Sequence, residues 1–181
     1  CHGQNIRTFE TWSATVGLQS SDNYLIINPF FHSFGYKAGW LAAIISGAHI
    51  LPVLNFDLDT VLAQIARDKI SMIPGPPTIY QSLLAHPRRG EYDLSSLRLA
   101  VTGAAPVPVE LVRQMREVLG FEVVVTAYGL TETCGVVSIC RADDSAERIS
   151  HTSGCAMAGT EIQCVDKAGK AVAAGVDGEI W

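Results

Sequence analysis

Basic residues are scarce in this sequence, and they do not gather anywhere along it. Asp and Glu number 18 against 13 Lys and Arg, which gives a formal net charge of -5 at pH 7. The longest basic stretch is the pair Arg88-Arg89. Proteins that hold nucleic acid neutralise its phosphates with clustered Lys and Arg side chains. The composition therefore gives no support to a nucleic-acid partner, and we expect none.

Long apolar runs and paired cysteines are also missing. The longest apolar stretch, residues 38–46, falls far short of the roughly 20 residues that a transmembrane helix needs. No signal-peptide pattern of charged start, apolar run and cleavage site is present. The five cysteines include no CxxC pair, and a structural zinc site is not expected. Because an odd number of cysteines cannot pair completely, reduced thiols in the cytoplasm are the simpler interpretation.

Apolar residues, by contrast, are plentiful. Hydrophobic residues make up 48% of the 181 positions, and the mean hydropathy is +0.23. That is enough for one sizeable buried core. The chain starts at Cys1 and stops at Trp181 inside a strand-like run, GEIW, where a natural domain rarely ends. We therefore expect a fragment of a longer protein.

Short apolar runs alternate with segments of helical periodicity. The runs predict strands at residues 24–28, 48–53, 70–74, 97–103 and 122–127. The segments between them predict helices at residues 35–47, 57–69, 76–86 and 108–120. This repetition requires crossover connections, hence a parallel sheet with helices on both faces. The prediction is an α/β subdomain over residues 1–140, followed by the start of a small β-rich subdomain over residues 141–181.

Three segments follow predicted strands and carry residues suited to ligand binding. They read NPFFHSFG (28–35), TGAAP (102–106) and AYGLTE (127–132). Ligands of open α/β sheets bind at the carboxyl ends of the strands. Turn formation alone would account for each segment, but three of them together predict a ligand cleft at this edge.

The AYGLTE segment offers complementary groups for a metal-bound nucleotide. Tyr128 can stack on a planar heterocycle, and Gly129 allows the backbone a close approach to a ligand. The Thr131 hydroxyl can donate to a phosphate oxygen, and Glu132 can bind Mg²⁺, which prefers carboxylate and phosphate oxygens. The structural alternative is that Thr131 and Glu132 only begin a helix, with Thr131 as its N-cap.

Other candidates have equally plain alternatives. His32 stands among phenylalanines, where a histidine is more often a core residue with satisfied hydrogen bonds. Lys37 lies in an otherwise apolar predicted helix, where it can extend its ammonium to solvent or sense a substrate carboxylate or acyl group. The solvent interpretation is the simpler one. TGAAP is similar to the start of a short-chain dehydrogenase fingerprint, but the later glycines are missing, so a nicotinamide site is not expected.

Taken in order, PFFHSFG, TGAAPVP and AYGLTET resemble the AMP-forming acyl-CoA synthetases. That superfamily also includes peptide-synthetase adenylation domains and firefly luciferase. HGQNIRTFETW resembles the helix after the phosphate loop of the family, and SGCAMAGTEIQCVD with GEIW resembles the segments after its Thr-Glu motif. The resemblance covers essentially the whole chain. It is strongest toward bacterial fatty-acid-CoA-ligase-type members, including those that act on sterol-derived ring acids.

The resemblance implies an acyl-CoA ligase that joins a carboxylic acid to coenzyme A through an acyl-adenylate, using ATP and Mg²⁺. The implied catalytic residues are Thr131 at the α-phosphate, Glu132 as the metal ligand, and His32 as an aromatic gate beside the carboxylate. Nucleotide contacts, with adenine stacked on the tyrosine, are implied for Ala105, Thr126, Ala127, Tyr128, Gly129 and Thr131. Contacts with the acyl substrate are implied for His32, Phe34, Gly35, Gly103, Ala104 and Gly129.

Parts of the family pattern are missing from the chain. The Ser/Thr/Gly-rich phosphate loop is expected before Cys1. The acidic residue that holds the ribose and the C-terminal domain with its catalytic lysine are expected beyond Trp181. The Thr-His pair of the family stands here as Cys1-His2. We therefore expect the isolated chain to be unable to complete the reaction.

Two alternatives to a ligase stay open. One is a non-catalytic homologue that binds an acyl group or a nucleotide. The other is an adenylation domain that loads a carrier protein. Peptide-synthetase domains usually pair an aspartate with the substrate amine near the gate, and NPFFHSFGY contains none. An acid without an amino group is therefore favoured.

Overall fold

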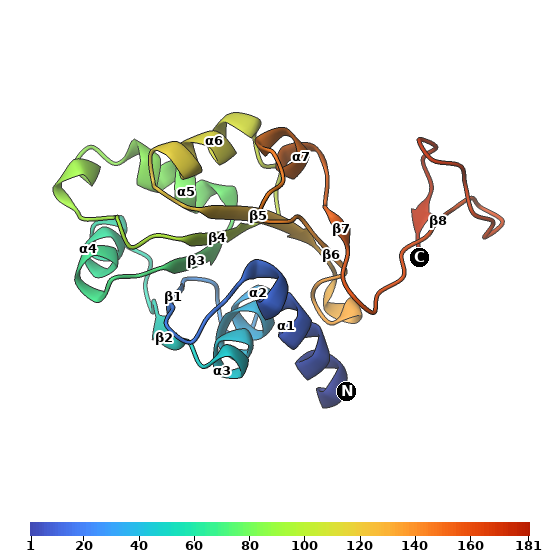
Figure 1. Ribbon diagram of the computed structural model, residues 1–181, viewed down its shortest axis with the longest axis horizontal. Helices are drawn as coiled ribbons and strands as arrows, with labels where there is room; N and C mark the ends of the chain where they lie inside the picture. Colours follow the sequence, from blue (N-terminus) through green and yellow to red (C-terminus); the bar gives the residue numbers. More distant parts are fainter.

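The fold is built on one large, mostly parallel sheet. A computed structural model describes all residues from Cys1 to Trp181. Seven strands form the sheet in the spatial order β2-β1-β3-β4-β5-β6-β7 (Figure 1). Neighbours from β2 to β5 pair in parallel, and β6 and β7 add antiparallel pairs, so the predicted α/β class is confirmed. The strands are β1 (Asn23–Ile26), β2 (His49–Pro52), β3 (Met72–Gly75), β4 (Leu99–Thr102), β5 (Val123–Tyr128), β6 (Ser138–Ile139) and β7 (Cys155–Ala156).

Helices cover both faces of this sheet. In Figure 1, α5, α6 and α7 lie on one side of it, and α1 and α3 lie on the other. The α-helices are α1 (His2–Val16), α2 (Ser33–Gly35), α3 (Ala42–Ser46), α4 (Leu58–Asp68), α5 (Pro77–Ala85), α6 (Val109–Glu117) and α7 (Ala146–His151). A π-helix, η1 (Tyr36–Leu41), and two 3-10 helices, η2 (Arg89–Glu91) and η3 (Thr131–Thr133), complete the set. None of these helices combines the length and the hydropathy that a membrane crossing requires.

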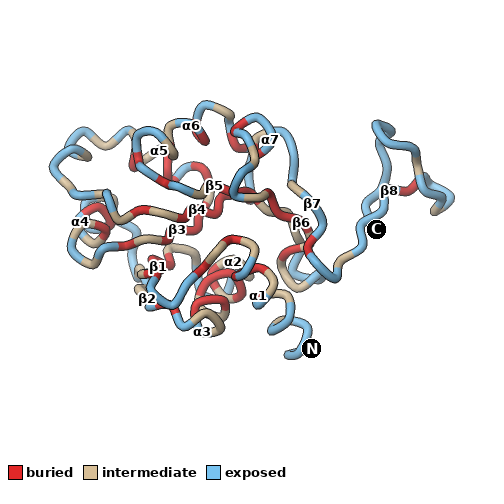
Figure 2. Tube along the Cα trace, in the orientation of Figure 1, coloured by how far each residue is buried: buried red, intermediate tan, exposed pale blue.

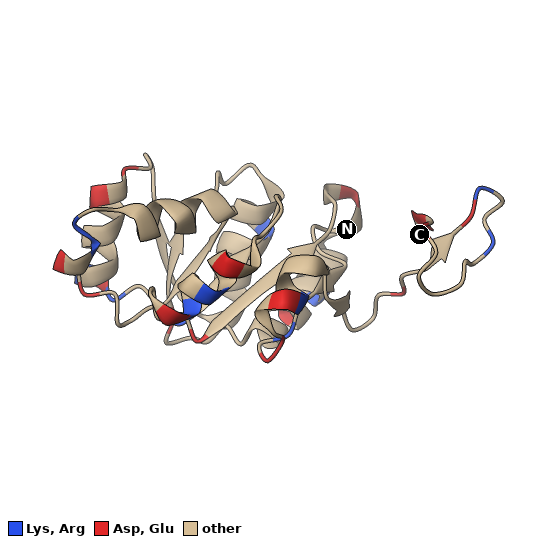
Figure 3. Ribbon diagram, turned by 90° about the horizontal axis from the view of Figure 1, so that it is seen from above, with Lys and Arg blue, Asp and Glu red and all other residues tan.

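The core lies between the sheet and its two helical layers. The seven strands contain no Asp, Glu, Lys or Arg, and Figure 3 shows charged residues on helices, in loops and in the C-terminal hairpin. Strands β3 and β4 are buried along their whole length. Figure 2 shows buried residues along these central strands and on parts of the helices that pack against the sheet. Continuous apolar runs are typical of parallel strands covered on both faces, which is why the sequence predicted them.

The predicted helix over residues 35–47 is divided into α2, η1 and α3. Gly39 interrupts the regular turn with φ -88° and ψ -108°. The hydroxyl of Tyr24 in β1 donates a hydrogen bond of 2.5 Å to the Ala38 carbonyl inside the wide turn. Burial raises the pKa of Tyr24 well above its ordinary value, so this hydroxyl stays a donor. Gly47 ends α3 with φ 72°, at the last residue of the predicted helix.

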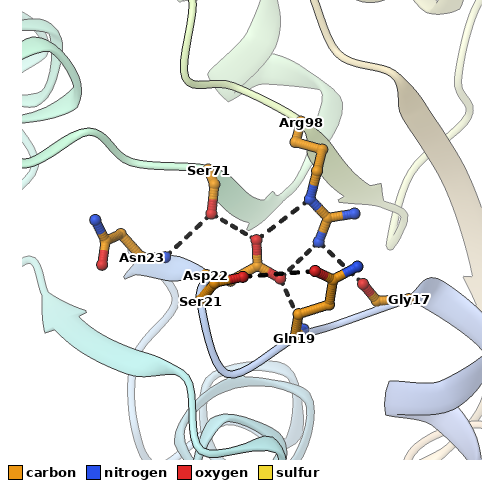
Figure 4. Close-up of polar contacts among 7 residues, drawn as sticks. All are labelled: Gly17, Gln19, Ser21, Asp22, Asn23, Ser71 and Arg98. Atoms are coloured by element: carbon orange, nitrogen blue, oxygen red, sulfur yellow. Dashed lines mark hydrogen bonds and ion pairs between the residues drawn. The ribbon is translucent and has the colours of Figure 1, made fainter.

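A buried carboxylate joins the amino ends of three strands to α1 (Figure 4). Asp22 Oδ2 accepts hydrogen bonds from Arg98 Nη2 at 2.5 Å and from the Gln19 amide at 2.8 Å. Its Oδ1 accepts from Ser71 Oγ at 2.7 Å. Arg98 also donates to the Gly17 carbonyl after α1. Because these residues precede β1, β3 and β4, the cluster fixes the amino edge of the sheet and leaves the carboxyl edge free for other chemistry.

The C-terminal residues form a second, two-stranded sheet. Strands β8 (Cys164–Val165) and β9 (Glu179–Ile180) pair antiparallel, and Figure 1 shows this hairpin projecting from the main body. Before it, α7 packs on α6 and β7 pairs with β6, so these elements accompany the large sheet. The division of the chain into subdomains at residue 140 stays a prediction.

Candidate active site

The carboxyl ends of β4 and β5 lie side by side. Thr102 stands opposite Thr126 in the parallel pairing of these strands. The TGAAP and AYGLTE segments therefore leave the sheet at the same edge. Strand β1 pairs in parallel with β3, so the NPFFHSFG segment leaves there as well. The topology thus places all three sequence-predicted segments at one edge of the sheet.

An apolar cavity of about 170 Å³ opens at this edge, between α1, the start of α2 and the ends of β4 and β5. Nine of its 15 lining residues are hydrophobic, so it suits an apolar ligand. Five of the six residues expected to contact the acyl group line it: His32, Phe34, Gly103, Ala104 and Gly129. The sixth, Gly35, does not. It is buried where any side chain would overlap the Pro29 carbonyl, so the structure gives it a packing role.

Eight of the 15 residues that line the apolar cavity were not predicted as site residues, and three of these eight are notable. Phe9 and Trp12 of α1 are each 1% exposed and form part of its wall, with ring centroids 6.0 Å apart. Their spacing of three residues indicates that they share one face of a helix, but it does not indicate whether that face packs on a core or on a ligand cavity. Thr102, also 1% exposed, lines the cavity with an Oγ1 that has no hydrogen-bond partner. An orphaned buried hydroxyl beside a cavity is a group that a ligand can satisfy.

A second hollow, the strand-end groove, lies on the other side of the same strand ends. Its volume is about 390 Å³, and α7 with the residues after it forms its far wall. Four of the residues predicted to bind nucleotide line it: Ala105, Thr126, Ala127 and Tyr128. The groove and the apolar cavity share four residues, namely Gly103, Ala104, Ala127 and Tyr128. Ligands in the two hollows would therefore be separated by little more than these residues.

Thr131 and Glu132 stand in the exposed 3-10 turn η3, beyond both hollows. The turn begins at Leu130, whose amide donates to Thr133 Oγ1 at 3.0 Å. Thr131 and Glu132 therefore do begin a short helical turn, but its N-cap is Leu130 and not Thr131. The side chains of Thr131 and Glu132 take part in none of the hydrogen bonds or ion pairs within the chain, so they are free to bind a ligand.

A metal site in this chain would have to rest on few protein ligands. No group of three or more His, Cys, Asp or Glu side chains could hold a metal ion. Mg²⁺ is commonly bound by one or two carboxylates, with phosphate oxygens and water as its other ligands. The exposed carboxylate of Glu132 fits that kind of coordination.

The backbone around the hollows adopts strained and tightly packed conformations. Ala104 has φ 62° and Cys134 has φ 66°, in the left-handed region that costs a residue with a Cβ roughly 1–2 kcal/mol. Ala104 lies between Gly103 and Ala105, at the border of the two hollows. Such strain persists where the surroundings hold the chain firmly, and it gathers at functional sites.

His32 is exposed at the rim of the apolar cavity. Its Nδ1 accepts a hydrogen bond of 3.1 Å from the Phe34 amide and so caps α2. The interpretation of His32 as a core residue is therefore wrong. With Nδ1 accepting, the neutral ring carries its proton on Nε2, which is the nitrogen left for a ligand.

The sequence also has relatives of known activity. A model of the AMP-binding enzyme family matches residues 2–181. Two curated relatives are named 3-[(3aS,4S,7aS)-7a-methyl-1,5-dioxo-octahydro-1H-inden-4-yl]propanoyl:CoA ligase. The protein of Rhodococcus jostii (strain RHA1) is 49% identical over 166 residues, which are 92% of this chain and 32% of the relative. The protein of Mycobacterium tuberculosis (strain ATCC 25618 / H37Rv) is 50% identical over 165 residues, 91% of this chain and 32% of the relative. The chain thus spans about a third of the length of these relatives.

Solved structures show the same fold. An anthranilate CoA ligase in complex with anthranoyl-AMP superposes with a TM-score of 0.88 at 28% identity, over 99% of this chain and 35% of that one. An O-succinylbenzoate coenzyme A synthetase from Bacillus subtilis, in complex with ATP and magnesium ion, gives 0.84 at 28% identity, over 98% and 36%. The resemblance found in the sequence is confirmed, and this chain belongs to the AMP-binding enzyme family.

Proposed function

We propose that this chain is part of an ATP-dependent acyl-CoA ligase, which activates a carboxylic acid as an acyl-adenylate and transfers it to coenzyme A. The observation that carries the proposal is the pair of adjoining hollows at the ends of β4 and β5. An apolar cavity and a more open groove share four wall residues there. A reaction between an apolar acid and a nucleotide needs two binding sites that meet at the reacting atoms.

The strand-end groove is the proposed nucleotide site. Tyr128 would stack on adenine there, beside Ala105, with Thr126 and Ala127 bordering the same groove. Gly129, the next residue along the chain, lines the apolar cavity instead. Its proposed contact is therefore at the boundary between nucleotide and acid.

The η3 turn is the proposed phosphate site. The Thr131 hydroxyl would donate to an α-phosphate oxygen, and Glu132 would hold Mg²⁺ together with phosphate oxygens and water. When bound, this ion would neutralise negative charge that builds up on the phosphates. Both side chains are exposed, and no protein group competes for either of them.

The apolar cavity is the proposed site of the acyl group. His32 at its rim would pack beside the reacting carboxylate, and Phe34 would contact the acyl body. Gly103 and Ala104 have little or no side chain, so the acid can approach the backbone there. The curated relatives above are named for a propanoic acid that carries a fused two-ring system with two oxo groups. We infer that the substrate here is an acid of that class.

The proposed chemistry proceeds in two displacements. A carboxylate oxygen attacks the α-phosphorus of ATP, and the bond to the leaving pyrophosphate breaks. The sulfur of coenzyme A then attacks the acyl carbon and loses its proton, and AMP leaves with the electron pair. The first step is needed because a carboxylate is a poor electrophile. The chain's own contribution is mostly the placement of the two reactants.

Coenzyme A is the proposed thiol acceptor, in preference to a carrier protein. The support is that the two relatives at 49% and 50% identity are named as CoA ligases. A location in the cytoplasm is also proposed. Its support is that all five cysteines are free, as expected for a reducing compartment.

The test is ATP–pyrophosphate exchange by the full-length protein that contains these residues, measured against a panel of acids. We expect acid-dependent exchange, fastest with an oxo-substituted ring acid, and its loss in the Glu132→Gln variant. Glu122→Gln is the matched control, because Glu122 is exposed just before β5, at the opposite edge of the sheet. If a folded protein shows no exchange with any acid, the ligase proposal is wrong and the binding homologue is favoured.

A further inference from the structure

The far wall of the strand-end groove consists of the end of α7 and the residues after it, and the proposed function gives these residues no role. Four of the five carry a side chain that can form hydrogen bonds. The five are Ile149, Ser150, His151, Thr152 and Ser153. The edge of a nucleotide base carries donors and acceptors, so a polar wall suits it. This wall is therefore where a residue that recognises the base should be sought.

The position of this wall is fixed by contacts at both of its ends. Helix α7 packs on α6, and Arg113 of α6 donates a hydrogen bond of 2.5 Å to Glu147 of α7. After the helix, Gly154 lies directly against the backbone of Ile139 in β6, and a Cβ on it would be 2.1 Å from the Ile139 carbonyl carbon. Side chains on a wall that is already in place can select a ligand without a cost for ordering them.

His151, the last residue of α7, has one ring nitrogen engaged and one free. Its Nδ1 lies 2.8 Å from the Glu147 carbonyl oxygen, one turn earlier in the helix. Because a carbonyl oxygen can only accept, Nδ1 carries a proton and donates it. The neutral ring then has no proton on Nε2, which is an acceptor on the side of the ring away from that carbonyl. His151 is exposed and lines the groove, and its Nε2 has no hydrogen bond within the chain.

All other polar side chains of the groove end in hydroxyl groups, which cannot tell a donor from an acceptor. The hydroxyls belong to Thr126, Tyr128, Ser150, Thr152 and Ser153. A hydroxyl rotates and either donates or accepts, so it accommodates both kinds of partner. Only His151 has a fixed polarity, set by its hydrogen bond to Glu147. A preference among bases that a side chain of this groove imposes must therefore come from His151.

We propose that His151 is a specificity-determining residue, whose Nε2 accepts a hydrogen bond from the exocyclic amino group of adenine. This inference rests on the proposed function, in which the base stacks on Tyr128 in the same groove. Adenine presents that amino group as a donor, whereas guanine and hypoxanthine carry an acceptor oxygen at the same ring position. Two acceptors would then face each other without a shared proton, which is unfavourable. His151 therefore selects ATP over nucleotides with an oxygen at this position.

The experiment removes each partner of this hydrogen bond separately and then both together. Acid-dependent pyrophosphate exchange by the full-length protein is measured with ATP and with purine riboside triphosphate, which has hydrogen in place of the amino group. Loss of the amino group should lower kcat/KM for the nucleotide about 10-fold, and so should His151→Phe with ATP, mainly through KM. The two changes together should lower it no further than either alone, because both delete the same interaction.

Two further variants show whether the acceptor itself is responsible. His49→Phe is the matched control: His49 is exposed at the amino end of β2, and its Nδ1 is likewise engaged, 2.9 Å from Asn23 Oδ1. It lies at the edge of the sheet opposite the groove, so this variant should keep the full preference for ATP. His151→Gln should keep part of the preference, because its amide oxygen can accept the same hydrogen bond.

Each other outcome counts against the inference. If the unaltered protein uses the two nucleotides equally well in an acid-dependent reaction, the proposed function stands and the role of His151 is wrong. If His151→Phe lowers kcat/KM for both nucleotides by the same factor, the residue supports the fold or the phosphates instead of the base. If no nucleotide exchanges with any acid, the proposed function fails together with this inference. Unaltered exchange of purine riboside triphosphate reports that the His151→Phe variant is folded, so a loss with ATP alone cannot come from misfolding.

Discussion

Gly129 lies directly against the backbone of Gly135, and a Cβ on Gly129 would overlap the Gly135 carbonyl and the Val136 Cα. The loop between the two glycines carries Thr131 and Glu132. It is closed by a hydrogen bond of 2.8 Å from the Gly135 amide to the Leu130 carbonyl. The sequence suggested that Gly129 allows a ligand to approach the backbone. The structure adds that another segment of the chain approaches it, and that this contact sets the position of the η3 turn.

Gly129→Ala should therefore displace the η3 turn and reduce acid-dependent exchange by about 100-fold or more, because misplacement of a catalytic group by about 1 Å has that effect. Gly90→Ala is the matched control, since Gly90 is exposed and no atom lies near its missing side chain. Exchange rates are compared after circular dichroism has shown that both variants are folded. Full activity in Gly129→Ala would mean that the turn does not need this contact.

His32 combines a structural role with a proposed catalytic one, and two substitutions separate them. His32→Asn keeps a side-chain acceptor that can cap α2, whereas His32→Ala removes both the cap and the ring. We expect the asparagine variant to unfold at the temperature of the unaltered protein but to lose about 10-fold in kcat/KM for the acid. The alanine variant should lose stability as well. Unchanged kcat/KM in the folded asparagine variant would show that the ring has no part in acid binding.

The positions of the main strands could be predicted, because a strand covered by helices on both faces appears in the sequence as a continuous apolar run. Strands β1 to β5 each lie within a predicted run or within two residues of it. The two-residue strands β6 and β7 give no such signal, since they are too short for any period to show. Strand β6 forms by pairing with β5, and β7 forms by pairing with β6, and no local period in the sequence records these contacts.

The sequence shows local patterns but not contacts between segments, and this explains which residues around the two hollows were not predicted. Tyr128, which lines both hollows, could be predicted as a site residue because turn residues and polar or aromatic side chains stand together after a strand, whereas the role of Thr131 stays a prediction. Phe9 and Trp12 give only the spacing of a helix face, and nothing local tells whether that face meets a core or a cavity. The π-helical turn η1 could not be predicted, because its segment is apolar on nearly all sides. Without alternating polar and apolar faces, the sequence does not show where a helix departs from its regular turn.

The cluster around Asp22 predicts a large loss of stability on removal of its carboxylate. The Asp22 side chain is 3% exposed and the Arg98 side chain 23%. Breaking a buried pair leaves an uncompensated charge, so Asp22→Ala should lower the free energy of unfolding by about 3–5 kcal/mol. The exposed pair of Lys69 and Asp93 is the comparison, and Asp93→Ala should have a much smaller effect. Denaturant unfolding of the full-length protein measures both, and equal effects would contradict the structural role of the cluster.

Asp57 predicts how the stability of α4 depends on pH. It caps this helix: its Oδ2 accepts from the Thr60 hydroxyl at 2.6 Å and from the Thr60 amide at 2.8 Å. These two hydrogen bonds, the hydroxyl first, lower the pKa of Asp57 below its ordinary value of 3.8. A carboxylate whose pKa is lower in the folded state stabilises that state fully above pH 3.8, and the contribution is lost as the pH falls through the folded-state pKa.

Asp57→Asn isolates this charge, because asparagine is an equally good N-cap without ionisation. We expect the unaltered protein to unfold at a higher temperature than the variant at pH 7, where the carboxylate is charged. The charge also interacts favourably with the amino end of the helix. As the pH falls below 3.8, the two unfolding temperatures should converge, because the unaltered side chain becomes neutral too. Thermal unfolding of both proteins from pH 7 to pH 3 measures this, and a difference that stays constant over the whole range would show that the capping charge does not stabilise α4.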